Sequence, residues 1–499
     1  MGGRLLIGLV VVLLLAVAGI GALVVSGTIA VSSLPLLLHA ITGKGGSSVS
    51  AGEATQRFTL PEGFSLSLYA DNLPNARFLR FTSAGDLLVS RARESDIVLL
   101  ERDNDRDGSA DSAEVLLSGL NRPLGMDFKD GYLYYAEANR VSKIRFNSAS
   151  GTVVGKPEVI IDGLSDDGNH PYKTIRFGSD GKLYLSQGST CNVCVEEDPR
   201  RGTMMRFDAD GSNGQILATG LRNSVGFAWA PWSGDLYATD NGRDLLGDDF
   251  PPCELNLIEA GAFYGWPWYN GNNIEDPDMG ADPQRRKRTP VAPVHSFRAH
   301  NAPLGIAFIN ASAWPAAYAR SALVALHGSW NRSEPDGYKV VSLHWSESGI
   351  EERDFLAGFN LDGDIVGRPV DVAQGPHGAV YISDDYAGAI YRVAYAEDAG
   401  SDVLALSKTP STPTPLPRWV RKADLDNLAA QGSSLYQQLD CSSCHEHGES
   451  PRRLDHLRGQ KDYARVLAVL QSPPPPMPAL PISELQRRAL AVYLLRKPD

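Results

Sequence analysis

The sequence predicts an all-β protein built as a six-bladed β-propeller, with a small all-α domain near its C-terminus and a transmembrane helix at its N-terminus. Three observations support this: a strand–turn–strand unit recurs six times, Gly (49) and Pro (32) are abundant, and residues 58–397 lack any helical periodicity. A β-sandwich is the alternative, but sandwiches do not repeat internally at this spacing. The expected segments are 1–42 (membrane), 43–57 (linker), 58–397 (propeller), 398–418 (linker) and 419–499 (helical domain).

The N-terminal segment is apolar enough to cross a bilayer. No charged residue lies between Arg4 and Lys44, and residues 5–25 form an uninterrupted apolar run. A cleavable signal peptide, which usually has a shorter apolar core, is the alternative. In both cases the rest of the chain is exported. We therefore expect a bacterial inner-membrane anchor with the folded part in the periplasm, or release into the periplasm after cleavage.

Composition narrows the possible partners. The net charge is −12 with 43% hydrophobic and 21% charged residues, so a soluble globular body is expected and nucleic acid is excluded as a partner. Of the five cysteines, Cys191 and Cys194 form a C-x-x-C without a following His. A local disulfide is favoured over a catalytic pair, because no thioredoxin-like pattern surrounds them.

Six copies of the repeat unit can be aligned. Each copy reads as a hairpin whose tip contains an Asp-Gly, Ser-Gly or similar pair that tolerates positive φ. Further strands, such as RVSKIRF and AIYRVAY, follow most copies. Four strands per unit and six units predict the propeller. The copies begin at Ala76, Pro123, Tyr172, Ser224, Pro303 and Pro369.

Three stretches depart from the repeat. They are residues 166–170, residues 220–271, and residues 327–332 together with 367–369. Together they supply a His, several Arg residues whose planar guanidinium groups suit carboxylates, many oxygen donors and aromatic rings. Because propellers bind ligands through the loops of one face, these stretches predict a site for an anionic planar cofactor and a calcium ion.

The most specific motifs are N-H-x6-F-G-x-D-G-x-L-Y (Asn169 to Tyr184), G-x-R-N at Gly220, D-N-G…E-L-N and Y-G-W-P. In these motifs the propeller resembles the soluble quinoprotein sugar dehydrogenases, the PQQ-dependent glucose and aldose dehydrogenases, and within them the L-sorbosone dehydrogenase-like branch. The resemblance implies that an aldose-type sugar or sugar aldehyde is oxidised, with His170 as the base that takes the sugar proton.

The resemblance also implies the cofactor contacts. PQQ would be held by Arg222, Asn223, Trp330, Asn331, Arg332 and Arg368. Calcium would be held by the backbone carbonyls of Gly242 and Arg243 and by Asp248, Asp249 and Glu254. Two departures bear on these sets. The family's Arg-x-Arg pair reads Arg368-Pro369-Val370, and Cys253 replaces the acidic residue before Glu254, a loss for which Asp248 and Asp249 could compensate.

Plainer interpretations stand beside these roles. His170 could be an ordinary hydrogen-bonding loop residue, although its position before the F-G-x-D-G-x-L-Y repeat favours the base. Arg222 and Asn223 could form a salt-bridged turn. Packing is expected of Trp266 and Trp268, and structural roles of His295, His300 and His377.

A separate acidic loop fits the spacing D-x-D-x-D-G of a calcium-binding loop. Strands rather than helices are expected on both sides of it, so an EF-hand is excluded. The loop is either an isolated calcium site or a solvated acidic turn. Its candidate ligands are Asp103, Asp105, Asp107, Asp111 and Glu114.

The C-terminal motif Cys441-Ser442-Ser443-Cys444-His445 is the C-x-x-C-H pattern that attaches haem c through two thiols, with His445 as an axial ligand of the iron. Met477 is the expected sixth ligand. A zinc half-site or a redox C-x-x-C is the alternative. The segment also resembles a small cytochrome c domain, with one helix ending near Tyr436 and another opening at Ser483.

Together these features predict a quinohaemoprotein. Electrons from sugar would pass through PQQ to the haem and on to a respiratory acceptor, and the Ser/Thr/Pro-rich residues 398–418 would tether the two domains. Two rivals are a non-enzymatic propeller binding module with an electron-relay cytochrome, and a calcium-dependent lactonase-type propeller.

Overall fold

The computed structural model of the chain describes residues 57–395, except 106, 285–287, 311, 313 and 362, and then 422–439, 441, 463–471, 480 and 482–496. The chain divides into two compact units, residues 1–402 and 403–499. The predicted membrane segment and the linker at 398–418 lie outside the described residues. Within the described part, no helix is long and apolar enough to cross a bilayer.

The first unit contains six antiparallel four-stranded sheets, which confirms the predicted six-bladed propeller. Blade 1 consists of β2 (Ala76–Phe81), β3 (Leu87–Arg91), β4 (Asp96–Leu100) and β5 (Ala113–Ser118). Blade 2 consists of β6 (Met126–Lys129), β7 (Tyr132–Ala136), β8 (Val141–Asn147) and β9 (Thr152–Ile161). Blade 3 consists of β10 (Lys173–Phe177), β11 (Leu183–Gln187), β12 (Thr203–Phe207) and β13 (Gln215–Thr219).

The last three blades carry the insertions. Blade 4 consists of β14 (Phe227–Trp229), β15 (Leu236–Asp240), β16 (Cys253–Leu257) and β19 (His295–Phe297). Blade 5 consists of β20 (Pro303–Phe308), β21 (Ser321–Leu326), β22 (Lys339–Ser346) and β23 (Gly349–Leu356), with the 3-10 turn η3 (Ala316–Tyr318). Blade 6 consists of β26 (Pro369–Gln374), β27 (Val380–Asp384), β28 (Ala389–Tyr395) and β1 (Phe64–Ala70). Two short hairpins lie outside the blades, β17 (Tyr269–Asn270) with β18 (Ile274–Glu275), and β24 (Asn360–Leu361) with β25 (Asp364–Ile365).

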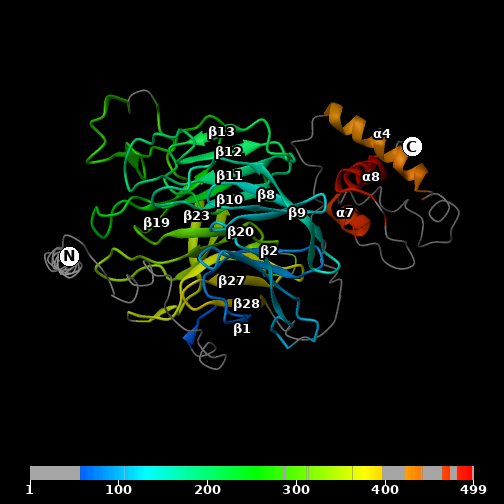
Figure 1. Cartoon of the computed structure of the whole chain (residues 1–499), viewed down its shortest axis with the longest axis horizontal. Helices are drawn as coiled ribbons and strands as arrows, with labels where there is room; N and C mark the ends of the chain where they lie inside the picture. Colours follow the sequence, from blue (N-terminus) through cyan, green and yellow to red (C-terminus); the bar gives the residue numbers. More distant parts are fainter. Residues whose placement is uncertain are drawn as a thin grey trace, which may run out of the picture. The chain divides into compact units, whose positions relative to one another are not determined.

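Strand β1 closes the ring. It is the first of the described strands, yet it pairs antiparallel with β28, from Phe64 opposite Tyr395 onward, and so completes blade 6. Each predicted sequence repeat corresponds to an inner hairpin, whereas the contribution of β1 was not predicted. Figure 1 shows β10 to β13 following one another outward, and β27, β28 and β1 doing so on the other side.

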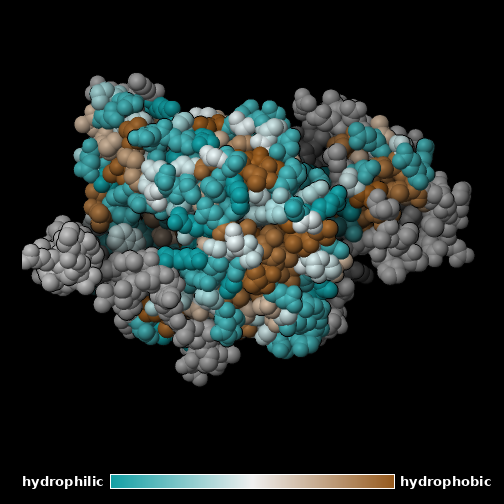
Figure 2. Space-filling model, viewed as in Figure 1, coloured by the Kyte–Doolittle hydropathy of each residue, from teal (hydrophilic) through white to brown (hydrophobic). Residues whose placement is uncertain are grey.

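Apolar side chains fill the spaces between blades. Six buried clusters each join residues from two neighbouring blades, so every blade buries both faces of its sheet. The face drawn in Figure 2 is accordingly mainly hydrophilic. A seventh cluster of the propeller takes one residue from each blade near the start of its inner strand: Phe78, Leu124, Tyr172, Val225, Leu304 and Val370. This ring is an apolar plug across the channel.

Glycines allow the inner strands to approach one another just beyond this plug. A Cβ on Gly125 would lie 2.7 Å from the Cα of Thr174, and one on Gly226 would lie 2.9 Å from the Cα of Gly305. Real Cβ atoms do not come that close to backbone, so these positions require Gly. Neighbouring inner strands therefore pack backbone against backbone just beyond the apolar plug.

The second unit contains three described helices: α4 (Lys422–Gln438), α7 (Tyr463–Gln471) and α8 (Glu484–Arg496). They share a core that includes Leu435, Val466 and Leu490. Helices α4 and α8 meet at Gly432, where an added Cβ would overlap the carbonyl oxygen of Ala489. The two predicted helices are thus present. Cys444, His445 and Met477 lie outside the described residues.

Candidate functional site

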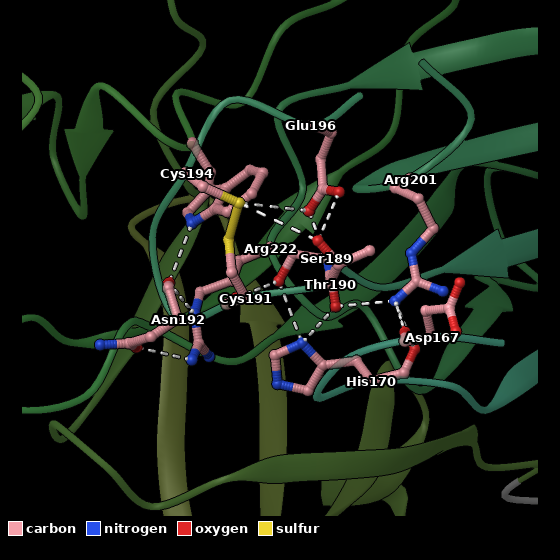
Figure 3. Close-up of a disulfide and its surroundings, with 11 residues drawn as sticks. Asp167, His170, Ser189, Thr190, Cys191, Asn192, Cys194, Glu196, Arg201 and Arg222 are labelled. Atoms are coloured by element: carbon pink, nitrogen blue, oxygen red, sulfur yellow. Dashed lines mark hydrogen bonds between the residues drawn. A yellow bond between two sulfur atoms is a disulfide. The ribbon is translucent and has the colours of Figure 1, made fainter. Parts of the chain in front are cut away.

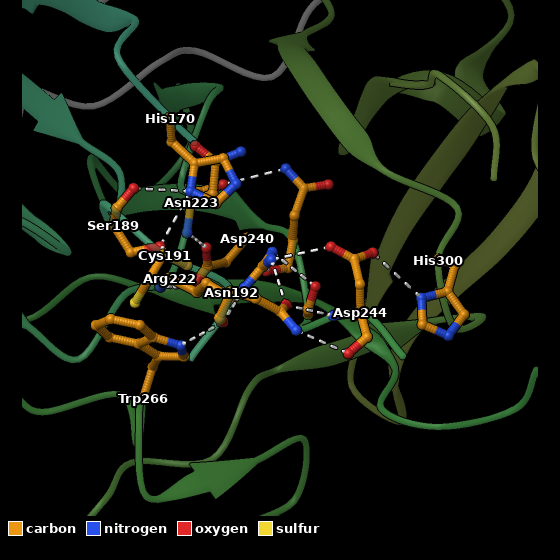
Figure 4. A network of polar contacts seen from close by, with 12 residues as sticks. His170, Ser189, Cys191, Asn192, Arg222, Asn223, Asp240, Asp244, Trp266 and His300 are labelled. Atoms are coloured by element: carbon orange, nitrogen blue, oxygen red, sulfur yellow. Dashed lines mark hydrogen bonds and ion pairs between the residues drawn. The ribbon is translucent and has the colours of Figure 1, made fainter. Parts of the chain in front are cut away.

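The predicted site residues gather at one end of the propeller. His170, Asn223 and Arg368 come shortly before the inner strands β10, β14 and β26, and Asp240 is the last residue of the antiparallel second strand β15. Because inner strands share one direction and second strands run back, these positions meet at the same end of the channel. We call this end the His170 end. Figure 4 shows the polar network there.

The imidazole of His170 is held in one tautomer. Its Nδ1 lies 2.9 Å from the carbonyl oxygen of Ser189 and 3.0 Å from the Ser189 hydroxyl. That hydroxyl donates its own proton to the carbonyl of Cys191 at 2.8 Å. Both Ser189 oxygens are therefore acceptors, so Nδ1 carries the proton and Nε2 keeps a free lone pair.

Burial and the nearby Arg222 guanidinium lower the pKa of His170 to about 3. Arg201 also contributes, and it fixes the loop by donating to the carbonyls of His170 (3.1 Å) and Ser189 (2.9 Å). The imidazole is consequently neutral at physiological pH and can accept a proton at Nε2.

A disulfide joins Cys191 and Cys194 beside this histidine, as Figure 3 shows, which confirms the predicted local disulfide. The small loop that it closes presents Asn192, whose Oδ1 accepts from Arg222 Nη2 (2.9 Å) and from the backbone N–H of Asp244 (2.8 Å). The loop thereby connects Ser189, which contacts His170, to Asn192, which contacts Arg222.

Arg222 is 4% exposed, and each of its donors is occupied. Nε donates to Asn192 O (3.0 Å), Nη1 to the carbonyls of Asn241 (3.1 Å) and Gly242 (2.8 Å), and Nη2 to Asn192 Oδ1 and to Asp244 Oδ2 (3.1 Å). These contacts account for all five N–H groups of a guanidinium. Arg222 thus links its own loop to the loop of Asn192 and to the loop of residues 241–244. The alternative interpretation, a salt-bridged turn, accounts only for its ion pair with Asp244.

The other predicted cofactor arginines also donate to backbone. Arg332 donates to the carbonyls of Asp248 and Ala299. Arg368 donates to the carbonyls of His327 (3.1 Å) and Gly328 (2.8 Å). A direct contact of either guanidinium with a cofactor remains a prediction. Their observed role is to orient the loop that carries Trp330 and Asn331.

His327 was not singled out from the sequence. Its Nε2 lies 2.9 Å from Asp385 Oδ1, and Arg77 lies 2.5 Å from the other oxygen of the same carboxylate. Burial and the Arg368 guanidinium lower the pKa of His327 to about 3. The His170 end therefore holds two neutral histidines next to arginines.

Several side-chain amide atoms at this end make no hydrogen bond. Both side-chain atoms of Asn331 are buried and make no hydrogen bond, and the same is true of Oδ1 of Asn241 and of Asn301. Buried polar groups are normally paired, so such a concentration indicates a polar ligand. The one free donor, Nδ2 of Asn331, suits a carbonyl or carboxylate oxygen such as those of PQQ, whereas the three free Oδ1 atoms require donors, which sugar hydroxyl groups supply.

The three carboxylates predicted to bind calcium lie in different surroundings. Glu254 is buried, with Oε1 accepting from the N–H of Gly271 at 2.9 Å. In contrast, Asp248 accepts from the N–H of Ser333 at 3.0 Å, and Asp249 is exposed and lies 3.5 Å from Arg332. Among the described residues, the acidic clusters suited to a metal include none of these three carboxylates. Both aspartates contact the segment that carries Arg332 and Ser333, and their compensating role at a calcium site remains a prediction.

A different carboxylate accompanies Glu254. Asp240 and Glu254 line a cavity of about 20 Å³ together with Gly242. Burial raises the pKa of each acid, and Asp240 raises that of Glu254 further. Two buried carboxylates beside a space of this size fit a calcium ion, which would relieve their repulsion. The guanidinium of Arg243 pairs with Asp276 at 2.7 Å, and a calcium contact through its backbone carbonyl remains a prediction.

The acidic loop at 103–114 brings three of its five candidates together. The carboxylates of Asp103, Asp105 and Asp111 offer ligand atoms within 4.8 Å of one another. Two of these carboxylates already accept a hydrogen bond, because the backbone N–H of Asp107 donates to both Asp103 (3.0 Å) and Asp105 (3.2 Å). Glu114 lies in β5, opposite Leu99. Calcium binding at this loop remains a prediction.

The remaining aromatic and histidine residues fit structural roles. Trp266 and Trp268 are buried. His300 is buried, with Nε2 lying 2.8 Å from the carbonyl of Gly247, and His295 pairs with Glu352 at 2.8 Å. Sequence reasoning assigned no role to five residues of this site. Two of them stood within quoted motifs, Asn192 in the C-x-x-C and Asp240 at the start of D-N-G. The other three are Ser189, Arg201 and His327.

The chain matches the TrAA12-like family over residues 58–251 and 274–396. A protein of Borreliella burgdorferi without an assigned function is 29% identical over 365 residues, which is 70% of this chain and 93% of that protein. A pyrroloquinoline quinone-dependent sugar dehydrogenase of Hypocrea jecorina is 25% identical over 258 residues, covering 44% and 59% of the two chains. The calcium structure of the Trichoderma reesei carbohydrate-active enzyme of family AA12 has the same fold, with a TM-score of 0.59, 22% identity and coverage of 68% and 97%. The chain thus belongs to the TrAA12-like family.

Proposed function

We propose that the propeller is a PQQ-dependent sugar dehydrogenase in which His170 is the base. The observation that carries this proposal is the neutral imidazole of His170, whose Nδ1–H is bound to Ser189 and whose Nε2 is free to accept the proton of the sugar C1 hydroxyl. When bound, PQQ supplies a two-electron acceptor for the hydride of that carbon. The relationship to a PQQ-dependent sugar dehydrogenase supports this assignment.

The residues around His170 have supporting roles in this proposal. The side-chain amide of Asn331 and the unpaired Oδ1 of Asn241 bind polar groups of the cofactor or sugar. Arg222 and Arg201 hold the loops and supply positive charge, which favours an anionic cofactor and keeps the imidazole neutral until the cofactor is present. Calcium binds between Asp240 and Glu254. Its inclusion is supported by the calcium structure of a fold relative.

The preferred substrate is an aldose or a sugar aldehyde similar to sorbosone. This rests on the segment with Cys191 and Cys194, which resembles the sorbosone-type branch. The disulfide loop lies directly beside Ser189 and His170, where substrate selection by a loop is effective.

We further propose that the second unit is a cytochrome c domain. The C-x-x-C-H motif at Cys441 and the helices α4, α7 and α8 support covalent haem, with His445 and Met477 as the axial ligands. Electrons would pass from the propeller to this haem and then to a respiratory acceptor at the periplasmic face of the inner membrane. Residues 5–25 would be the anchor.

The two rivals lead to different results. A propeller binding module would not reduce its own haem when sugar is added, and a lactonase-type propeller would hydrolyse a sugar lactone without PQQ. The proposal predicts haem reduction in the purified protein, under anaerobic conditions, only when an aldose, PQQ and Ca²⁺ are all present. Sugar oxidation with an artificial acceptor but without haem reduction would retain the dehydrogenase and remove the relay. No PQQ binding would remove both.

A further inference from the structure

A second cavity lies at the opposite end of the propeller channel. It has a volume of about 400 Å³ and is lined by residues from the inner strands of all six blades, among them the residues near the strand ends Phe81, Phe177, Trp229 and Phe308. The His170 end lies at the start of the same strands, and the apolar plug separates the two. Small-molecule sites in proteins commonly have volumes of about 300–1,000 Å³.

One arginine in this cavity has no partner. Arg176, in β10, lines the cavity, and its guanidinium makes no hydrogen bond or ion pair with any residue that the structure describes. This contrasts with the arginines at the His170 end. An arginine side chain carries a permanent charge and five donors, so its donors must be satisfied by solvent or by a ligand.

The charged groups that face Arg176 do not satisfy it. Asp127 lines the cavity, but its oxygens accept from Arg80 (2.5 Å) and from the backbone N–H groups of Phe128 (2.7 Å) and Phe177 (2.7 Å). Asp371 acts on Arg176 electrostatically from behind the lining and accepts from the N–H of Leu79 at 2.9 Å. Two guanidinium groups and one carboxylate therefore line the cavity itself.

The rest of the lining is mainly apolar. Five aromatic residues, Phe227 among them, accompany Leu79, Ile306 and Val372. The side chain of Arg80 is 37% exposed, so solvent and small molecules reach this end of the channel. An inorganic anion would hydrogen-bond to the guanidinium but would make no favourable contact with the apolar walls. A flat hydrocarbon would contact the walls but would leave the guanidinium unpaired.

We propose that this cavity binds a small aromatic carboxylate. The carboxylate would accept two parallel hydrogen bonds from the planar guanidinium of Arg176, and the ring would lie against the aromatic and aliphatic walls. This binding site is separate from sugar oxidation at His170 and does not depend on the proposed function.

Benzoate is the probe for a calorimetric titration of the full-length protein, with benzyl alcohol as its neutral counterpart and inorganic phosphate as the anion without a ring. We expect benzoate to bind once per chain, and Arg176→Gln to weaken it by at least about tenfold. Benzyl alcohol and phosphate should bind no better than benzoate binds to the Arg176→Gln variant.

Two further variants control for folding and for location. Ala228→Leu fills the cavity without changing Arg176 and should also weaken benzoate, whereas Arg353→Gln, which removes an exposed ion pair with Glu351 on β23, should leave benzoate binding unchanged. Thermal melts verify that each variant is folded. The inference is overturned if benzoate does not bind, if Arg176→Gln binds it as tightly as the natural chain, or if benzyl alcohol or phosphate matches it.

Discussion

The two ends of the propeller channel use arginine in opposite ways. At the His170 end, all five N–H groups of Arg222 contact protein acceptors, and Arg332 and Arg368 donate to backbone carbonyls. At the other end, Arg176 has no protein partner among the described residues and faces a cavity of about 400 Å³. The difference shows that an arginine near a site need not be a ligand contact: its hydrogen bonds decide whether it supports the loops or is free to receive an anion.

The largest effect is expected at the base. His170→Ala should lower kcat for sugar oxidation by about 10²–10⁴-fold, because no other group replaces Nε2 as the proton acceptor. PQQ binding, measured by titration, and the haem spectrum should change little. His377→Ala, which alters an exposed histidine, is the matched control. Turnover retained in the His170→Ala variant would exclude it as the base.

The contrast between the arginines can be tested with the same substitution at both ends. Arg222→Lys replaces five used donors by three and leaves buried acceptors unpaired, so the free energy of unfolding should fall by about 2–4 kcal/mol. Arg176→Lys removes no hydrogen bond and should change it by less than about 0.5 kcal/mol. Chemical denaturation gives both values. Equal losses for the two variants would contradict the assignment of Arg222 as a support.

The disulfide should affect activity more than stability. It closes a loop of very few residues, so its loss adds little conformational entropy to the unfolded chain. It does position Ser189 and Asn192, so replacing both Cys191 and Cys194 by Ser should lower kcat/KM by about tenfold through misplacement of His170 and Arg222. The melting temperature should change little. A large loss of stability with unchanged kcat/KM would reverse this interpretation.

The smallest effect concerns pH. His170 and His327 have pKa values near 3 in the folded protein, well below the ordinary value of 6.5, because of burial and neighbouring arginines. Between these values the unfolded chain binds protons that the folded chain does not, so stability is lost as pH falls below about 6.5. His327→Gln should make the melting temperature depend less on pH between about 6.5 and 4. His377→Gln should leave that dependence as it is, and an unchanged slope in His327→Gln would show that the buried imidazole does not cause it.

The fold was largely predictable because its signals are local. A short, continuous stretch of sequence forms each inner hairpin. Its tip is a pair such as Asp130-Gly131, where Asp130 has φ 49° and Gly131 has φ 76°. Helix α8 follows apolar spacing in the same way. The closing pair of β1 with β28 was not predictable from such signals, because Phe64 and Tyr395 lie far apart in the sequence.

The site was predictable in its location but less so in its contacts. His170 carried a motif, and the disulfide followed from the C-x-x-C. The pairing of Asp240 with Glu254, in contrast, depends on how β15 lies against β16. The hydrogen bonds that occupy every donor of Arg222 depend on three loops that meet only in the folded chain. The free guanidinium of Arg176 was invisible for the same reason, since a sequence shows a charge but not its missing partner.

The most direct test of the central claim is a single-turnover measurement. The protein, loaded with PQQ and Ca²⁺, is mixed anaerobically with an aldose, and the absorbance of the quinone is followed in the natural chain and in the His170→Ala variant. We predict rapid loss of the oxidised-quinone spectrum in the natural chain and none on the same time scale in the variant. A quinone that stays oxidised in the natural chain across a panel of aldoses and sugar aldehydes would contradict the assignment of sugar oxidation to the His170 end.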